Sequence, residues 1–102
     1  MKGNSLNQFV SDMLEFLGPE KEFTCGNKYY IIQGDRLQPG SNITGLRVDV
    51  YENINDDAGE FIEDYFFPGE KNDECFEKFV KAKIFDGKTF YEVENDIEVL
   101  YG

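Results

Sequence analysis

The chain has 102 residues, which is enough for one globular domain and too few for two ordinary ones. Its 40% hydrophobic and 30% charged residues are typical of a folded protein and exclude a disordered one. The formal net charge of −11 is concentrated after residue 50, where 5 basic and 15 acidic side chains follow a first half with 5 basic and 6 acidic ones. Nucleic acid and anionic lipid are therefore excluded as expected partners, because this charge would repel both.

The N-terminus lacks the apolar run of a signal peptide, and no segment approaches the length of a membrane span. We therefore expect a cytoplasmic protein. Cys25 and Cys75 form no Cys-x-x-Cys motif and lie in apolar patterns, which predicts two reduced thiols in the core. No cofactor or metal is expected, and the oligomeric state stays open.

The first predicted element is a helix that begins near Ser5. Ser5 and Gln8 have the spacing of a capping box, in which each side chain bonds to the backbone N–H of the other residue. Apolar residues then recur at helical spacing on a single stripe, formed by Leu6, Phe9, Val10, Met13, Leu14 and Leu17. Gly18-Pro19 is predicted to end the helix, because proline cannot continue it.

Two hairpins follow, which predict a four-stranded, largely antiparallel sheet. In the first, Gly26-Asn27 forms a tight turn within residues 22–33. In the second, an alternating strand over 46–50 returns over 60–67 after an Asp-Asp-Ala-Gly turn at 56–59. Pro68-Gly69 is predicted to end the sheet. The connection from Gly34 to Gly45 is predicted to be irregular, and loops of this length often carry function.

Two C-terminal helices complete the predicted α+β domain, which spans residues 1–102. Asn72 is expected to cap the first of them, and Thr89 with Glu92 forms a second capping box. The end of the chain has two interpretations. Phe90, Val93, Ile97 and Leu100 indicate a helix, which we favour, whereas Ile97, Val99 and Tyr101 indicate a last strand.

Motifs that carry chemistry are incomplete in this chain. Residues 53–64 resemble a calcium-binding loop, but the glycine is one position late, the closing residue is Asp64, and the flanks are predicted strands. Gly87-Lys88-Thr89 lacks the earlier glycine of a phosphate-binding loop. The chain has no histidine, which removes the usual base at neutral pH. An enzyme is not expected, and a carboxylate-based hydrolase ranks well below the other hypotheses.

The acidic C-terminal half carries the leading functional hypothesis. Its predicted helices present rows of carboxylates that would attract a basic protein, as in inhibitor or immunity-type proteins. The candidate partner-binding residues are Asp73, Glu74, Glu77, Glu92, Glu94, Asp96 and Glu98. The same rows would also serve solubility alone. The alternative hypothesis is a module that binds a small ligand or peptide, using the 34–45 loop and an aromatic sheet face formed by Tyr29, Tyr51, Tyr65 and Phe67.

Overall fold

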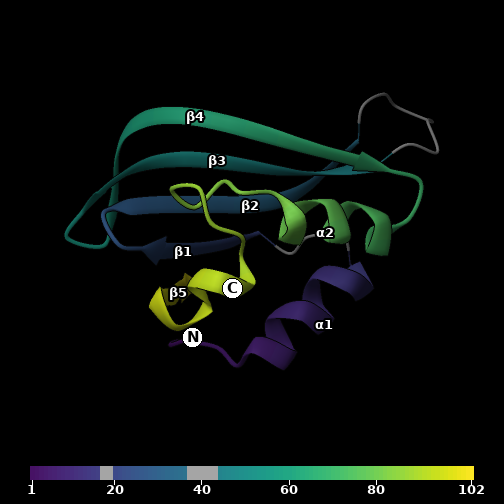
Figure 1. Ribbon diagram of the computed structural model, residues 1–102, viewed down its shortest axis with the longest axis horizontal. Helices are drawn as coiled ribbons and strands as arrows, with labels where there is room; N and C mark the ends of the chain where they lie inside the picture. Colours follow the sequence, from purple (N-terminus) through teal and green to yellow (C-terminus); the bar gives the residue numbers. More distant parts are fainter. Residues whose placement is uncertain (17–19, 37–43) are drawn as a thin grey trace.

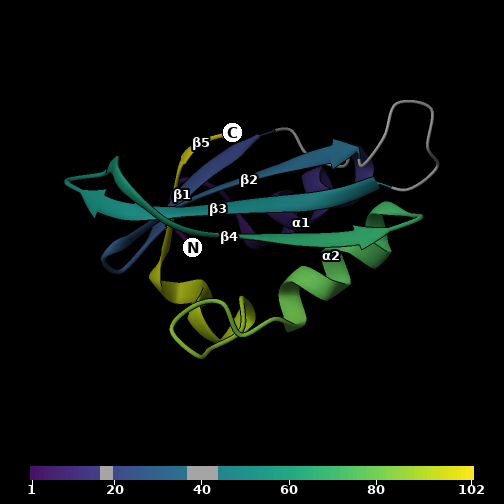
Figure 2. The ribbon, with the colours of Figure 1, turned by 90° about the horizontal axis from the view of Figure 1, so that it is seen from above.

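A five-stranded antiparallel sheet in the order β4-β3-β2-β1-β5 forms the framework of the protein. The computed structural model describes residues 1–16, 20–36 and 44–102. The elements are α1 (Leu6–Phe16), β1 (Lys21–Cys25), β2 (Lys28–Arg36), β3 (Thr44–Ile54), β4 (Asp57–Gly69), α2 (Asn72–Lys81), the 3₁₀ helix η1 (Tyr91–Asp96) and β5 (Ile97–Tyr101). The core is formed by buried side chains of α1, α2, the segment from Ile84 to Val93 and one face of the sheet. Figures 1 and 2 show how these elements are arranged around the sheet. The α+β class is confirmed, whereas the predicted strand count and helix layout are wrong.

The N-terminal helix begins as predicted. Gln8 N donates to Ser5 Oγ at 3.1 Å, which satisfies one of the unpaired amides of the first turn. The Gln8 side chain does not complete the capping box, because Ser5 N donates to Asn4 Oδ1 instead, and the Gln8 amide group donates to Asp12. Phe9 and Met13 are fully buried on the inner face of α1. The predicted stop at Gly18-Pro19 lies outside the described residues.

The first hairpin forms as predicted around Gly26-Asn27, where Gly26 has a φ of 62°. The second hairpin turns earlier than predicted, at Asn55-Asp56, and the strand resumes at Asp57. Asn55 and Asp56 both adopt positive φ, which is the geometry that a two-residue hairpin turn requires. Asn53 Oδ1 also accepts a hydrogen bond from Asp56 N at 2.8 Å. The predicted turn at 56–59 is therefore wrong by about two residues.

Pro68-Gly69 does not end the sheet, because β4 continues through Gly69. Proline is tolerated there because β4 is an edge strand, so the missing N–H can face away from β3. Lys78 Nζ donates to the Pro68 carbonyl at 2.6 Å, and Gly45 pairs with Pro68 across the ladder. Gly34 and Gly45, the ends of the predicted loop, are both in strands, and residues 37–43 lie outside the described residues.

The favoured C-terminal helix is wrong, and the strand alternative is correct for residues 97–101. After η1, β5 pairs antiparallel with β1, and Ile97 and Val99 alternate into the core. Pairing along β1 satisfies backbone groups that a helix here would leave at an open sheet edge. Lys2 covers the outer side of β5, since Lys2 N donates to Ile97 O and Val99 N donates to Lys2 O.

The predicted cap of α2 is also wrong. Lys71 occupies the N-cap position without a side-chain hydrogen bond, and Asn72 instead donates to Leu14 O, which ties α2 to α1. The predicted Glu77–Lys81 pair forms at 2.6 Å. None of the described helices is long or apolar enough to cross a membrane.

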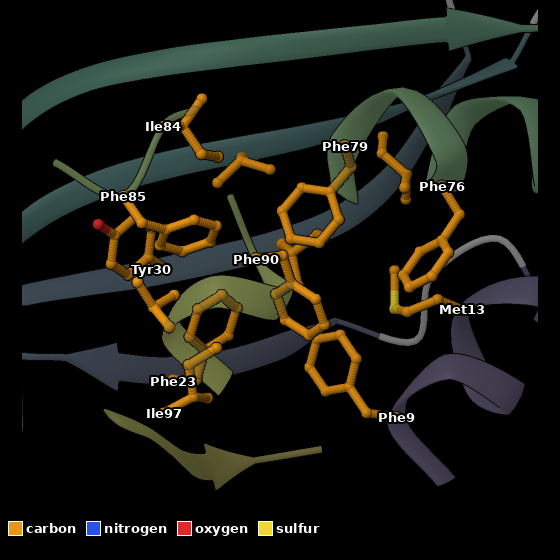
Figure 3. Close-up of a cluster of buried hydrophobic side chains, with 14 of the residues drawn as sticks. Phe9, Met13, Phe23, Tyr30, Phe76, Phe79, Ile84, Phe85, Phe90 and Ile97 are labelled. Atoms are coloured by element: carbon orange, nitrogen blue, oxygen red, sulfur yellow. The ribbon is translucent and has the colours of Figure 1, made fainter. Parts of the chain in front are cut away.

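Aromatic rings from both helices and the sheet fill the core. Phe90 is fully buried, and its ring centroid lies 5.3 Å from that of Phe9 and 5.2 Å from that of Phe79 (Figure 3). Phe85 continues the cluster toward Phe23 and Tyr30. Cys75 is buried as predicted. Cys25 is a free thiol too, but only half-buried, because it lies at the end of β1.

Among the residues whose burial the structure describes, one charged side chain lies buried in this core. Lys21 has no exposed surface, and its Nζ donates to Asp12 Oδ2 at 2.9 Å and to Gly102 O at 2.6 Å. The same nitrogen lies 5.4 Å from the centroid of the Phe9 ring. Lys21 thereby links α1 and the end of the chain through hydrogen bonds that satisfy its buried ammonium group.

Candidate functional site

A polar hollow of about 580 Å³ lies at the end of the sheet where the β1–β2 turn, the β3–β4 turn, η1 and the start of β5 meet. We call it the acidic hollow, because four carboxylates and two ammonium groups line it. These are Asp56, Asp86, Asp96 and Glu98, with Lys2 and Lys88. The six side chains come from four separate stretches of the chain, at residues 2, 56, 86–88 and 96–98, so only the folded chain brings them together.

The β3–β4 hairpin brings Asp56 to the hollow. Its tip is held against the β1–β2 turn, because Asn53 Nδ2 donates to Gly26 O at 3.2 Å and Asn53 N donates to Asn27 O at 3.0 Å. The positive φ angles of Asn55 and Asp56 reverse the chain there. The tip is thus anchored by the neighbouring turn.

A second tight turn holds Asp86. Phe85 and Lys88 exchange both backbone hydrogen bonds at 3.1 Å, and Asp86 and Gly87 both adopt positive φ between them. The buried Phe85 ring fixes this turn to the core. Lys28 Nζ lies 2.6 Å from Asp86 Oδ1, so this carboxylate is already paired.

Asp96 ends η1, and Glu98 lies one residue into β5. Glu98 pairs with Thr24 of β1 on one side and with Lys2 on the other, so its backbone is held by two neighbours. In the described parts of the chain, the side chains of Asp56, Asp96 and Glu98 form no ion pair. Three negatively charged groups therefore face the hollow without a salt bridge.

The thiol of Cys25 also lines the hollow. Burial raises its pKa, and the nearby carboxylates of Asp96 and Asp86 raise it further. A thiol with a raised pKa stays protonated at neutral pH and is a poor nucleophile. The hollow thus offers negative charge and hydrogen-bond acceptors but no activated sulfur.

Of the seven predicted partner-binding residues, the structure brings only Asp96 and Glu98 into the hollow. Glu92 Oε1 instead accepts hydrogen bonds from Thr89 N and Thr89 Oγ1, both at 3.0 Å, and these bonds lower the pKa of the Glu92 carboxyl. Glu94 Oε2 lies 3.4 Å from the N-terminal ammonium group of Met1. These two carboxylates are therefore engaged in local structure.

The three predicted residues on α2, which are Asp73, Glu74 and Glu77, are exposed and form a separate group. The Lys81 ammonium group lowers the pKa of the Glu77 carboxyl through a hydrogen bond. Glu74 Oε2 accepts a hydrogen bond from Glu70 N, and Asp73 Oδ1 accepts one from Glu74 N. Along the chain, the carboxylates of the hollow lie both before α2, at Asp56, and after it, at Asp86, Asp96 and Glu98.

Sequence reasoning missed Asp56 and Asp86. Both stand in segments that were predicted as turns, Asp56 beside Asp57 and Asp86 beside Gly87. Acidic residues in turns were attributed to turn geometry, and nothing in the sequence indicated that these two turns lie near each other. Asp-Gly and Asn-Asp pairs favour positive φ, and positive φ turns the chain sharply. This was the signal from which the two turns could have been predicted.

The four residues of the predicted aromatic face do not share one face. Tyr29 and Tyr51 are directly paired on the face opposite α1 and α2, and Tyr29 donates to Glu22 at 2.7 Å. Tyr65 and Phe67 pair with the core residues Val48 and Leu46, so they lie on the helix side. Phe67 contacts Phe79 of α2 there.

Metal-binding geometry is lacking in the described residues, where no three His, Cys, Asp or Glu side chains converge on one point. The segment that resembles a calcium loop forms the β3–β4 hairpin, with Asn53 and Asp64 in its two strands. Comparison with protein-family models found no match, and comparisons with curated proteins and with solved structures found none either. The function must therefore be argued from the site itself.

Proposed function

We propose that this chain is a non-enzymatic protein-binding domain whose acidic hollow receives lysine or arginine side chains of a basic partner. The observation that supports the proposal is the set of three carboxylates, on Asp56, Asp96 and Glu98, that face one concave site without an ion pair among the described residues. A guanidinium or ammonium group in the hollow would complete charge-assisted hydrogen bonds with them.

Concavity matters because field lines concentrate in a recess with low-dielectric walls. A charge on an open helix face is screened by water and salt, so it contributes little to affinity. The hollow is walled partly by Phe85, Val93 and Ile97, which exclude water from one side. We therefore assign short-range recognition to the hollow.

The carboxylates of α2 have a different role in this proposal. They add to the net charge of −11, which would steer a basic protein toward the domain from a distance. This division is typical of acidic inhibitors and immunity-type proteins, in which net charge speeds encounter and a few placed groups hold the partner. Catalysis has no role in the proposal, because the thiol of the hollow is held protonated and the chain has no histidine.

The test compares two double variants with the same change in charge. Asp96→Asn with Glu98→Gln neutralises the hollow, and Asp73→Asn with Glu74→Gln neutralises the α2 group. The probe is a fluorescent peptide of alternating lysine and glycine, whose glycines disfavour strand formation. We expect the hollow variant to lower affinity by about tenfold or more, and the α2 variant by about threefold or less.

Salt supplies the second measurement. Binding by the unaltered chain should weaken steeply as ionic strength rises, and this slope should become shallower in the hollow variant. Equal losses in the two double variants would show that the hollow has no special role. The same two variants can then serve as baits in host lysate at low and high salt, with mass spectrometry to identify a partner that only the hollow variant fails to capture.

A further inference from the structure

The two edges of the sheet differ in how they are covered. The outer side of β5 is covered by Lys2, through hydrogen bonds of 2.9 and 2.8 Å. At the opposite edge, β4 is the outermost strand (Figure 1), and in the described residues no other strand pairs with its outer side. An open edge of this kind is a template for an additional strand.

Pro68 shows which backbone groups of β4 face outward. Proline has no N–H, and its carbonyl accepts from Lys78 Nζ at 2.6 Å, so the backbone of Pro68 points away from β3. The register is uninterrupted from Glu63 to Gly69, and outward residues alternate along an antiparallel strand. The N–H and C=O groups of Phe66 and Asp64 therefore also point outward.

The side chains along β4 specify what kind of strand would fit. From Asp57 to Gly69 the strand carries no lysine or arginine and four carboxylates, on Asp57, Glu60, Glu63 and Asp64. Asp64 Oδ2 already lies 3.7 Å from Arg47 Nη2 of β3, so the other three supply most of the unpaired negative charge. It also exposes apolar surface, since Phe61 is 56% exposed and Ile62 is 43% exposed. A complementary strand would combine basic and apolar side chains.

We infer that β4 is a second contact site, at which an extended basic segment of the partner adds a sixth strand to the sheet. A second copy of this chain is disfavoured as the occupant, because antiparallel pairing of two β4 strands, each with four carboxylates and no basic residue, would bring like charges close together. The inference rests on the proposed function only for the basic character of the partner. The edge itself is independent of the acidic hollow.

The experiment uses a fluorescent peptide of alternating lysine and valine, about nine residues long, which matches the length of a strand. A matched peptide carries N-methyl groups on alternate backbone nitrogens, which keeps the charge but removes the strand-forming N–H groups. We expect N-methylation to lower affinity by about tenfold or more. Binding should also slow hydrogen exchange at the amides of Asp64 and Phe66, and the methylated peptide should not slow it.

A variant of the chain gives a second comparison. Asp64→Pro removes an outward N–H without removing a hydrogen bond to β3, and Asp64→Asn removes the same charge but keeps the N–H. Asp64→Pro should lower affinity for the lysine–valine peptide about tenfold, and Asp64→Asn about threefold or less. If Asp64→Pro does not fold, the two peptides on the unaltered chain decide the question.

Failure of this inference is distinguishable from failure of the proposed function. Equal binding of both lysine–valine peptides, absence of binding, or unchanged exchange at Asp64 and Phe66 would overturn the edge site. If the hollow variant loses lysine–valine binding and Asp64→Pro does not, the edge site is also overturned, but the proposal for the hollow stands. Loss in Asp64→Pro, with the hollow variant unaffected, would support the edge, and the lysine–glycine peptide would still test the hollow separately.

Discussion

Phe90 offers the sharpest test of how this core is held together. Its ring is fully buried, and it contacts the rings of both helices and of the 84–93 segment, with five ring centroids within 6.4 Å. Truncation of a buried phenylalanine to alanine removes about 3–5 kcal/mol through lost burial and the cavity left behind. Single domains have only about 5–15 kcal/mol of stability in total. Phe90→Ala should therefore lower Tm by roughly 15–30 °C.

The assay is urea unfolding followed by circular dichroism, with Tyr91→Ala as the matched control. Tyr91 is the next residue and is 51% exposed, so its truncation should remove less than about 1 kcal/mol. Phe90→Leu should fall between the two, because leucine fills part of the cavity. A loss of less than about 1.5 kcal/mol for Phe90→Ala, with an unchanged m-value, would show that this ring is not central to the core.

Two further predictions concern the sheet. A Cβ added to Gly45 would lie 2.3 Å from the Phe66 ring, so Gly45→Ala must displace that ring and should remove about 1–2 kcal/mol of stability. A double-mutant cycle with Phe66→Ala should show a smaller loss in the background that lacks the ring, and strict additivity would contradict the contact. Burial, and then the hydrogen bond to Glu22, raise the pKa of Tyr29 to about 12. Since the unfolded state ionises first, this contribution to stability is present below pH 10 and is lost as pH rises to about 12. Tyr29→Phe should flatten the decline in stability across that interval, measured by urea unfolding at stepped pH, and an unchanged slope would refute the assignment.

Local patterns predicted most of the elements correctly. The stripe from Leu6 to Leu14 identified α1, and Gly26-Asn27 identified the first hairpin, because both signals depend on residues close together in the chain. The α2 helix was predicted for the same reason, apart from its cap. The wrong predictions concern residues whose structure is set by contacts with residues far away in the sequence. Asn72 bonds to Leu14 O across a helix–helix contact instead of capping its own helix.

The C-terminal segment shows this limit most clearly. Ile97 fits both periodicities, with Leu100 on the helical one and Val99 on the alternating one. The structure is a strand because the free edge of β1 satisfies the backbone groups of β5. The sequence contains no feature near residue 97 that reports the position of residues 22–25. Short apolar runs are ambiguous for this reason.

The candidate site depended even more on tertiary structure. Sequence alone established the excess of carboxylates after residue 50, the lack of histidine and the helical stripe that buries Phe9 and Met13. Only the fold decided which carboxylates are paired. Glu77 is engaged by Lys81, Glu92 by Thr89, and Glu94 by the N-terminal ammonium group. Two tight turns bring Asp56 and Asp86 to the hollow that Asp96 also lines. The physical reason is the distance over which each kind of interaction acts. Periodicity and capping act over a few residues of sequence, whereas ion pairing and concavity depend on distances in space between segments that the sheet and the core bring together.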